Sequence, residues 1–156
     1  MKSTIYKQSV ESLSKAIDIA IDVVKIAPLK DFREQDRQQF ISVYLEYQHK
    51  ILNPLPQYAN MTSLKYSIND IFTYFQECGG QTVEMFWQKI KEAELPYKRE
   101  NKLAKILKRK WIKDDIEYDF VVDVIVPYQQ EGLITEDESM LLKQLIGGFE
   151  MKNKIK

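Results

Sequence analysis

Histidine and cysteine, side chains well suited to act as base and nucleophile near neutral pH, occur once each, as His49 and Cys78. Catalysis at this pH usually requires a poised base, an activated nucleophile or a metal. His49 falls near the end of an expected helix, where an imidazole can face water or interact with the helix carboxyl end. Cys78 precedes Gly79 and Gly80, and a cysteine beside a helix stop is typically a small buried apolar residue. We therefore expect no enzymatic activity.

Metal and nucleotide chemistry also have few residues to use. Zinc would need clustered cysteine and histidine ligands, and His49 and Cys78 are far apart in the sequence. A magnesium or manganese site is an alternative, built from the carboxylates of Asp114, Asp115, Glu117, Asp119 and Asp123. Helix capping and the helix dipole account for acids at these positions without a metal. The glycine pairs 79–80 and 147–148 lack the spacing of phosphate-binding loops, so we expect neither metal nor cofactor.

Charge changes sign abruptly in the last third of the chain, although 23 basic and 23 acidic residues cancel overall. Between residues 98 and 113 every charged residue except Glu100 is basic, and between residues 114 and 142 every charged residue is acidic. One interpretation is attraction between neighbouring elements of the same molecule. The other is a bipolar recognition surface, on which complementary charge speeds association with a partner.

Nucleic-acid binding is the alternative function that this charge pattern suggests. Lys102, Lys105, Lys108 and Arg109 recur at helical spacing, and a turn and a second helix follow, as in a helix-turn-helix. The helix after the turn would enter the groove, but here it is acidic and phosphates would repel it. A regulator that binds nucleic acid through the basic helix 98–113 therefore ranks behind protein binding.

Tyrosine and tryptophan anchor many protein interfaces, and this chain has nine tyrosines and two tryptophans. Their helical spacing suits core packing as well, so each has two interpretations. Those beyond the needs of a core are Tyr44, Tyr47, Tyr58, Tyr66, Tyr74, Tyr97, Trp111, Tyr118 and Tyr128. We predict that the partner is another protein. Its expected contacts, in the basic and acidic segments, are Lys102, Lys105, Arg109, Trp111, Asp115, Tyr118, Asp119 and Asp123.

Apolar residues that return at three- and four-residue steps predict an all-α fold, a compact bundle of about seven helices. Prolines and glycines separate these stripes. The expected helices span residues 6–24, about 31–51, 64–75, 82–95, 98–111, 114–127 and 135–149. Pro127 is expected to kink or end the sixth helix. Residues 121–126 are rich in β-branched side chains, but no second alternating run exists to pair with them, so we expect a helix there.

The helix starts and the domain organisation follow from local signals. Three starts have the spacing of a capping box, namely Asp31 with Glu34, Asp114 with Glu117 and Thr135 with Glu138. No internal repeat or long linker occurs, and 156 residues is a common size for one domain. We predict a single domain over residues 1–156, with a weak hinge near Pro96.

Composition indicates a cytoplasmic protein. A lone cysteine cannot form an intrachain disulfide, and the first residues, MKSTIYKQSVESL, contain no apolar stretch of the kind that a signal peptide needs. The most apolar segment, residues 17–28, contains Asp18, Asp22 and Lys25 and is shorter than the ~20 residues that cross a bilayer. We expect no binding to membranes.

The run KLAKILKRKWIKDDIEYDFVVDVI, followed by ITEDESMLLKQLIGGFE, resembles the tail of small helical bacterial immunity proteins of toxin-immunity pairs. The similarity lies in an Ile-x-x-x-x-Glu-Tyr turn, here Ile112 to Tyr118, and in an aromatic-Glu pair that ends the last helix, here Phe149 and Glu150. It covers about the last third of the chain. The resemblance implies a cytoplasmic protein that binds a cognate toxin and blocks it by occlusion, without chemistry of its own. Inhibitors of nuclease toxins are often strongly acidic, whereas this chain is neutral.

Overall fold

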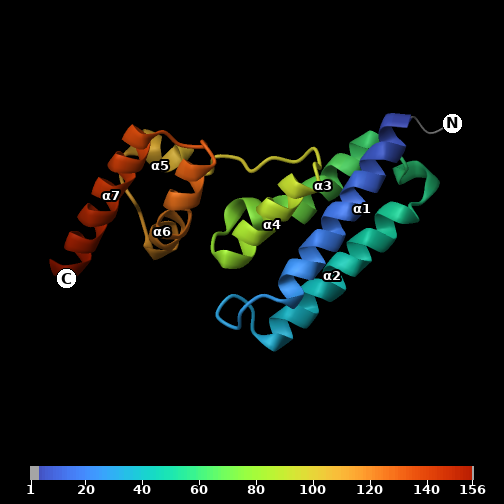
Figure 1. Cartoon of the computed structure of the whole chain (residues 1–156), viewed down its shortest axis with the longest axis horizontal. Helices are drawn as coiled ribbons and strands as arrows, with labels where there is room; N and C mark the ends of the chain where they lie inside the picture. Colours follow the sequence, from blue (N-terminus) through green and yellow to red (C-terminus); the bar gives the residue numbers. More distant parts are fainter. Residues whose placement is uncertain (1–3, 156) are drawn as a thin grey trace. The chain divides into compact units, whose positions relative to one another are not determined.

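The structure is a computed structural model that describes residues 4–155, with side chains described for residues 4–153. Over these residues it contains seven α-helices, one short 3-10 helix and no strand, which confirms the predicted all-α fold (Figure 1). The elements are α1 (Thr4–Lys25), α2 (Glu34–Leu52), η1 (Pro56–Tyr58), α3 (Met61–Glu77), α4 (Gln81–Glu92), α5 (Ala104–Arg109), α6 (Asp115–Gln130) and α7 (Glu136–Ile155). None of these helices is long and apolar enough to cross a membrane.

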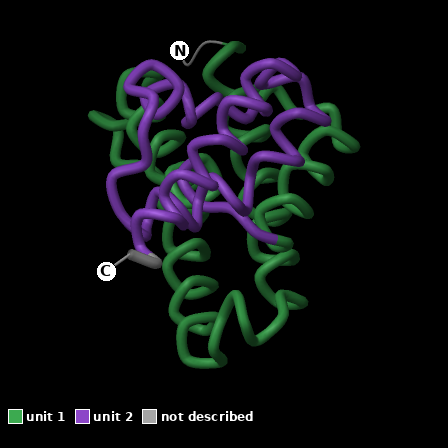
Figure 2. Tube along the Cα trace, turned by 90° about the vertical axis from the view of Figure 1, so that its left-hand side faces the viewer, with its two compact units in different colours: residues 1–76, 81–98 green, residues 77–80, 99–156 purple. Residues whose placement is uncertain are grey.

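The chain divides into two compact units (Figure 2). Unit 1 runs to Gln76 and resumes over Gln81–Lys98, so it contains α1 to α4. Unit 2 consists of Glu77–Gly80 and the chain from Arg99 onwards, which includes α5 to α7. Each unit has its own buried side chains, described below. The predicted single domain and the predicted hinge near Pro96 concern folding and motion, and both stay predictions.

Unit 1 is organised around α1, which packs against both α2 and α4. The predicted apolar stripe of α1 is buried, and Leu13 and Ile17 are fully enclosed. Ala16 and Ala20 are also fully buried, and their small side chains let neighbouring helices approach closely. Gln48 Nε2 of α2 donates hydrogen bonds to two residues of α1, at 2.8 Å to Asp18 Oδ1 and at 3.2 Å to the Ser14 carbonyl.

Aromatic side chains fill much of the remaining core of unit 1. The rings of Phe75 and Phe86 stack with centroids 3.7 Å apart. Trp87 Nε1 donates to the Phe75 carbonyl at 2.9 Å, and the Tyr44 hydroxyl donates to the Ile71 carbonyl. Both polar ends are therefore satisfied inside the core, as buried tyrosine and tryptophan require. For Tyr44, the core interpretation is the one that the structure supports.

The predicted capping box at Asp31 and Glu34 is wrong. The N-cap of α2 is Arg33, and no side chain caps this helix. Asp31 instead accepts hydrogen bonds from Thr82, at 2.6 Å from Oγ1 and 3.3 Å from the backbone N–H. Because Thr82 lies in the first turn of α4, Asp31 caps a helix whose Thr82 is 51 positions away in the sequence.

Unit 2 has a core of aliphatic residues around Tyr128, contributed by α5, α6, α7 and their connections. Asp114 caps α6 by accepting from the Glu117 N–H at 2.9 Å. Thr135 and Glu138 form the predicted reciprocal capping box of α7, at 3.1 and 2.9 Å. Residues 121–126 are helical, as predicted, and α6 continues past Pro127 to Gln130.

The predicted helix over residues 98–111 is much shorter, since α5 covers only Ala104–Arg109. Before α5, Asn101 Oδ1 accepts from the Leu103 N–H at 2.9 Å and Asn101 Nδ2 donates to the Leu133 carbonyl at 3.3 Å. These bonds hold the backbone in a turn, because an asparagine side chain competes with helical hydrogen bonding. After α5, Lys110 takes the left-handed conformation that ends a helix, with φ 67°.

Candidate functional site

All eight residues predicted to contact a partner lie in unit 2. Lys102 precedes α5, Lys105 and Arg109 belong to α5, and Trp111 lies between α5 and α6. The remaining four lie on α6, namely Asp115, Tyr118, Asp119 and Asp123. In the structure these residues fall into several groups with different surroundings.

Arg109 and Trp111 form one group, at the junction between α5 and α6. The guanidinium carbon of Arg109 lies 4.8 Å from the centroid of the Trp111 ring, within the range of a cation-π contact. Arg109 Nη2 also donates to Glu117 Oε1, and this oxygen accepts from the Lys113 N–H at 3.0 Å. The charge of Arg109 is therefore paired within the molecule. Trp111 keeps 52% of its surface exposed.

Lys102 and Lys105 form a second group, in a hollow of about 460 Å³. Glu77 and Glu100 line the same hollow, and Lys102 Nζ lies 3.1 Å from Glu100 Oε2. The two carboxylates offset the two ammonium groups, so this hollow has no excess of positive charge. Phosphate binding would need such an excess.

The outward face of α6 is the third group, and it is apolar as well as acidic. Ile116 is 80% exposed, Val126 56% and Val122 45%, and the acidic residues Asp115 and Asp119 are exposed beside them. Steps of three and four residues link these five into one strip along the helix, which covers about a third of its circumference opposite the buried side. We call Asp115, Ile116, Asp119, Val122 and Val126 the α6 face.

The opposite side of α6 is buried in unit 2, through Val121, Val124, Ile125 and Tyr128. This helix therefore has two apolar sides. Ile116, Val122 and Val126 were not singled out from the sequence. The four-residue step from Val122 to Val126, outside the buried set, was the signal that could have revealed a second apolar stripe.

Tyr118 and Asp123 also lie on α6, and each of them contacts another part of unit 2. The Tyr118 hydroxyl donates to Glu150 Oε1 at 2.8 Å, and its ring stacks on Phe149 with centroids 5.1 Å apart. The hydrogen bond to Glu150 is the main reason that the pKa of Tyr118 is raised. Asp123 meets the turn at Gly79, where an added Cβ would come within 2.8 Å of the Asp123 Cβ. Only glycine allows this close approach.

The two side chains considered for catalysis, His49 and Cys78, belong to different units. His49 is exposed in the last turn of α2, as its position at the helix end predicted, and its Nδ1 lies 3.4 Å from the side-chain Nδ2 of Asn53. Cys78 is partly exposed, and partial burial raises the pKa of its thiol. Over the side chains of residues 4–153, no three histidine, cysteine, aspartate or glutamate residues come close enough to hold a metal ion.

The chain is therefore all-α, and its unit 2 has an exposed helix face that is both apolar and acidic. Comparisons of the chain with protein-family models, with curated proteins and with solved structures found no match.

Proposed function

We propose that this chain is a non-catalytic protein-binding domain and that the α6 face is its contact surface. The observation that carries the proposal is the exposure of Ile116, Val122 and Val126 on the side of α6 that its own core does not use. Apolar surface releases free energy when it leaves water, about 25 cal/mol per Å². A partner that covers these three side chains would supply that burial, and grouped exposed apolar residues commonly mark such contacts.

Charge defines the chemistry of the partner. Asp115 and Asp119 lie beside the exposed apolar residues, so the complementary surface carries apolar side chains flanked by lysine or arginine. Trp111 lies just before the start of α6 and is half exposed, and tryptophan is among the residues that contribute most to protein binding. Its contact with Arg109 limits the motion of the ring before a partner binds, which reduces the entropic cost of association.

The most specific form of the proposal is an immunity protein that acts in the cytoplasm and neutralises a cognate bacterial toxin by occlusion. Support comes from the residues that carry the resemblance to this class. Tyr118 bonds to Glu150 and stacks on Phe149, so the turn motif and the aromatic-Glu pair meet where α6 packs on α7. This contact fixes α6 in place and leaves its outward face accessible.

Affinity capture with matched variants tests this proposal. The full chain is immobilised and exposed to nuclease-treated lysate of the source cells, and retained proteins are identified by mass spectrometry. We expect one protein to be retained by the wild type and at least tenfold less by Ile116→Lys. The control is Ile5→Lys in α1, because Ile5 is also well exposed, at 67%, and should not matter. Equal loss in both variants, or no face-dependent protein, would contradict the proposal.

A retained protein is a toxin if its expression alone stops growth and co-expression of this chain restores it. Restoration by the wild type and by Ile5→Lys, but not by Ile116→Lys, is the expected pattern. Growth arrest that the chain never relieves would count against the immunity role and leave the protein-binding role supported by the capture result.

The alternative proposal, a nucleic-acid-binding regulator that uses residues 98–113, has less support. Only Ala104–Arg109 of this segment is helical, and Arg109 is paired with Glu117. Lys102 and Lys105 share their hollow with two glutamates. Recovery of nucleic acid from an untreated lysate, with a strong dependence on salt, would favour this alternative.

A further inference from the structure

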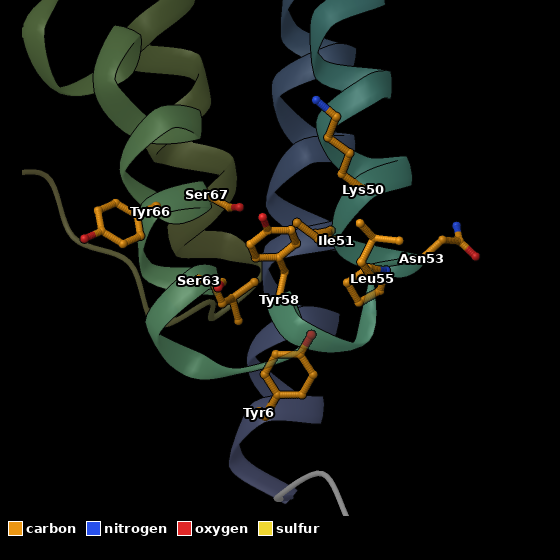
Figure 3. A pocket seen from close by; sticks show the side chains of 11 residues that line it. Tyr6, Lys50, Ile51, Asn53, Leu55, Tyr58, Ser63, Tyr66 and Ser67 are labelled. Atoms are coloured by element: carbon orange, nitrogen blue, oxygen red, sulfur yellow. The ribbon is translucent and has the colours of Figure 1, made fainter.

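A second hollow, of about 690 Å³, lies entirely within unit 1. The start of α1, the end of α2, η1 with the loop before it, and the first half of α3 form its walls (Figure 3). Tyr6, Ile51 and Leu64 line it and are themselves buried, whereas Leu55 and Tyr58 at its edge are 59% and 57% exposed. Its volume falls within the range of about 300–1,000 Å³ that small-molecule sites occupy.

The lining is mainly apolar, with a small number of uncharged polar groups. Figure 3 shows Ser63 and Ser67 facing the hollow from α3, close to the ring of Tyr58. Among the described residues that line it, Lys50 carries the ionisable amine, and this side chain extends away from Tyr58 in this view. Lys50 Nζ lies 3.3 Å from Glu46 Oε1, so its charge is already offset. An apolar lining with a few hydroxyl groups is typical of sites that orient a small ligand.

We propose that this hollow binds a small, uncharged aromatic molecule that carries one or two hydrogen-bonding groups. The rings of Tyr6 and Tyr58 offer stacking and edge contacts to an aromatic ligand, and Leu55 would cover it from the loop. Ser63 and Ser67 offer hydroxyl groups for one polar atom of the ligand. A charged ligand is disfavoured, because the hollow would remove its charge from water without supplying an opposite charge. This site is separate from the α6 face and does not depend on the proposed function.

Two fluorescent probes that share a ring system test the proposed chemistry on the full chain. N-Phenyl-1-naphthylamine is uncharged, and 1-anilinonaphthalene-8-sulfonate is the same framework with an added sulfonate. We expect saturable binding of the uncharged probe at one site per chain and at least tenfold weaker binding of the sulfonate. No saturable binding of the uncharged probe, or tighter binding of the sulfonate, would overturn the proposal.

Variants assign the binding to this hollow. Ser67→Phe places a ring in the hollow and is expected to weaken the uncharged probe at least tenfold, whereas Lys65→Phe adds the same ring to an exposed position of α3 and should leave binding unchanged. Leu55→Ala removes apolar contact from an exposed loop position with little risk to folding, and a several-fold loss is expected. Ile116→Lys should have no effect. Equal binding by wild type, Ser67→Phe and Leu55→Ala would place the probe elsewhere and contradict the assignment.

Discussion

At the scale of single residues, the surroundings of Cys78 determine its reactivity. Partial burial is the larger cause of the raised pKa of its thiol, and the charge of Glu77 adds to it. Because only the thiolate reacts rapidly, we expect less thiolate at pH 7.5 than in an unstructured peptide. Alkylation by iodoacetamide should be slower than in such a peptide, and its rate should go on rising with pH beyond the point at which the rate of the peptide levels off. Rapid, selective labelling at neutral pH would contradict this and would reopen the case for a nucleophile.

Asp31 is the residue whose role the structure changes most. It accepts two hydrogen bonds from Thr82, whose side chain is buried. Replacing a charged acceptor in such a pair typically costs about 1.5–3 kcal/mol. We therefore expect Asp31→Ala to lower the free energy of unfolding by about 2 kcal/mol in urea titrations. Asp22→Ala, at an exposed position of α1, is the control and should change it by less than about 0.5 kcal/mol.

At the scale of elements, α6 has a buried side and an exposed side that can be compared directly. Ile125 is buried and Ile116 is 80% exposed on the same helix. Removal of a buried isoleucine side chain costs about 2–5 kcal/mol, so Ile125→Ala should destabilise the chain by that amount. Ile116→Ala should change the free energy of unfolding by less than about 0.5 kcal/mol. A large cost at Ile116 would mean that this side of α6 is structural and would weaken its assignment to a partner.

The sequence predicts the elements well where local signals decide them. Periodicity located all seven helices, and the spacing at Thr135 and Glu138 predicted a cap that forms. The Asp31 prediction failed because the partner of Asp31 is 51 positions away, and no local pattern shows such a contact. The helix predicted from 98 was too long, because the Asn101 side chain competes with helical hydrogen bonding.

The candidate sites were harder to predict than the helices. Periodicity reports an apolar stripe but not whether the core or a partner covers it, so the exposure of Ile116 could not be predicted. Arg109 and Trp111 contact each other, as their closeness in the sequence allows, and their role in binding a partner stays a prediction. The hollow in unit 1 was missed because it forms where residues 50–67 fold back on themselves and meet Tyr6, an arrangement that only the tertiary fold creates.

At the scale of the whole molecule, the basic segment 98–113 and the acidic segment 114–142 partly pair with each other. Arg109 bonds to Glu117 across the point where the sign changes, which supports attraction within the molecule for that residue. Asp115 and Asp119 lie outside this pairing, on the exposed α6 face. They keep the acidic character that a recognition surface for a partner would require. Attraction within the molecule therefore applies to Arg109, and recognition of a partner by Asp115 and Asp119 stays a proposal.

The predicted single domain can be tested with the two tryptophans, because Trp87 lies in unit 1 and Trp111 in unit 2. Leu13 and Leu142, one in each unit, are fully buried, and each Leu→Ala change should cost about 2–5 kcal/mol. Each Leu→Ala change is measured in a Trp87→Phe background, where Trp111 is the reporter, and in a Trp111→Phe background, where Trp87 is the reporter. If the chain folds as one domain, each Leu→Ala change shifts the urea transitions of both reporters equally. A shift confined to the tryptophan of the altered unit would show two independently folding domains.

Site-specific photo-crosslinking in intact source cells tests the central claim most directly, that the α6 face binds another protein. p-Benzoylphenylalanine is placed at position 116 and, as a control, at position 5, two isoleucines of similar exposure. We predict a single protein adduct from position 116 that position 5 does not yield. The same adducts from both positions, or adducts to nucleic acid alone, would contradict the account.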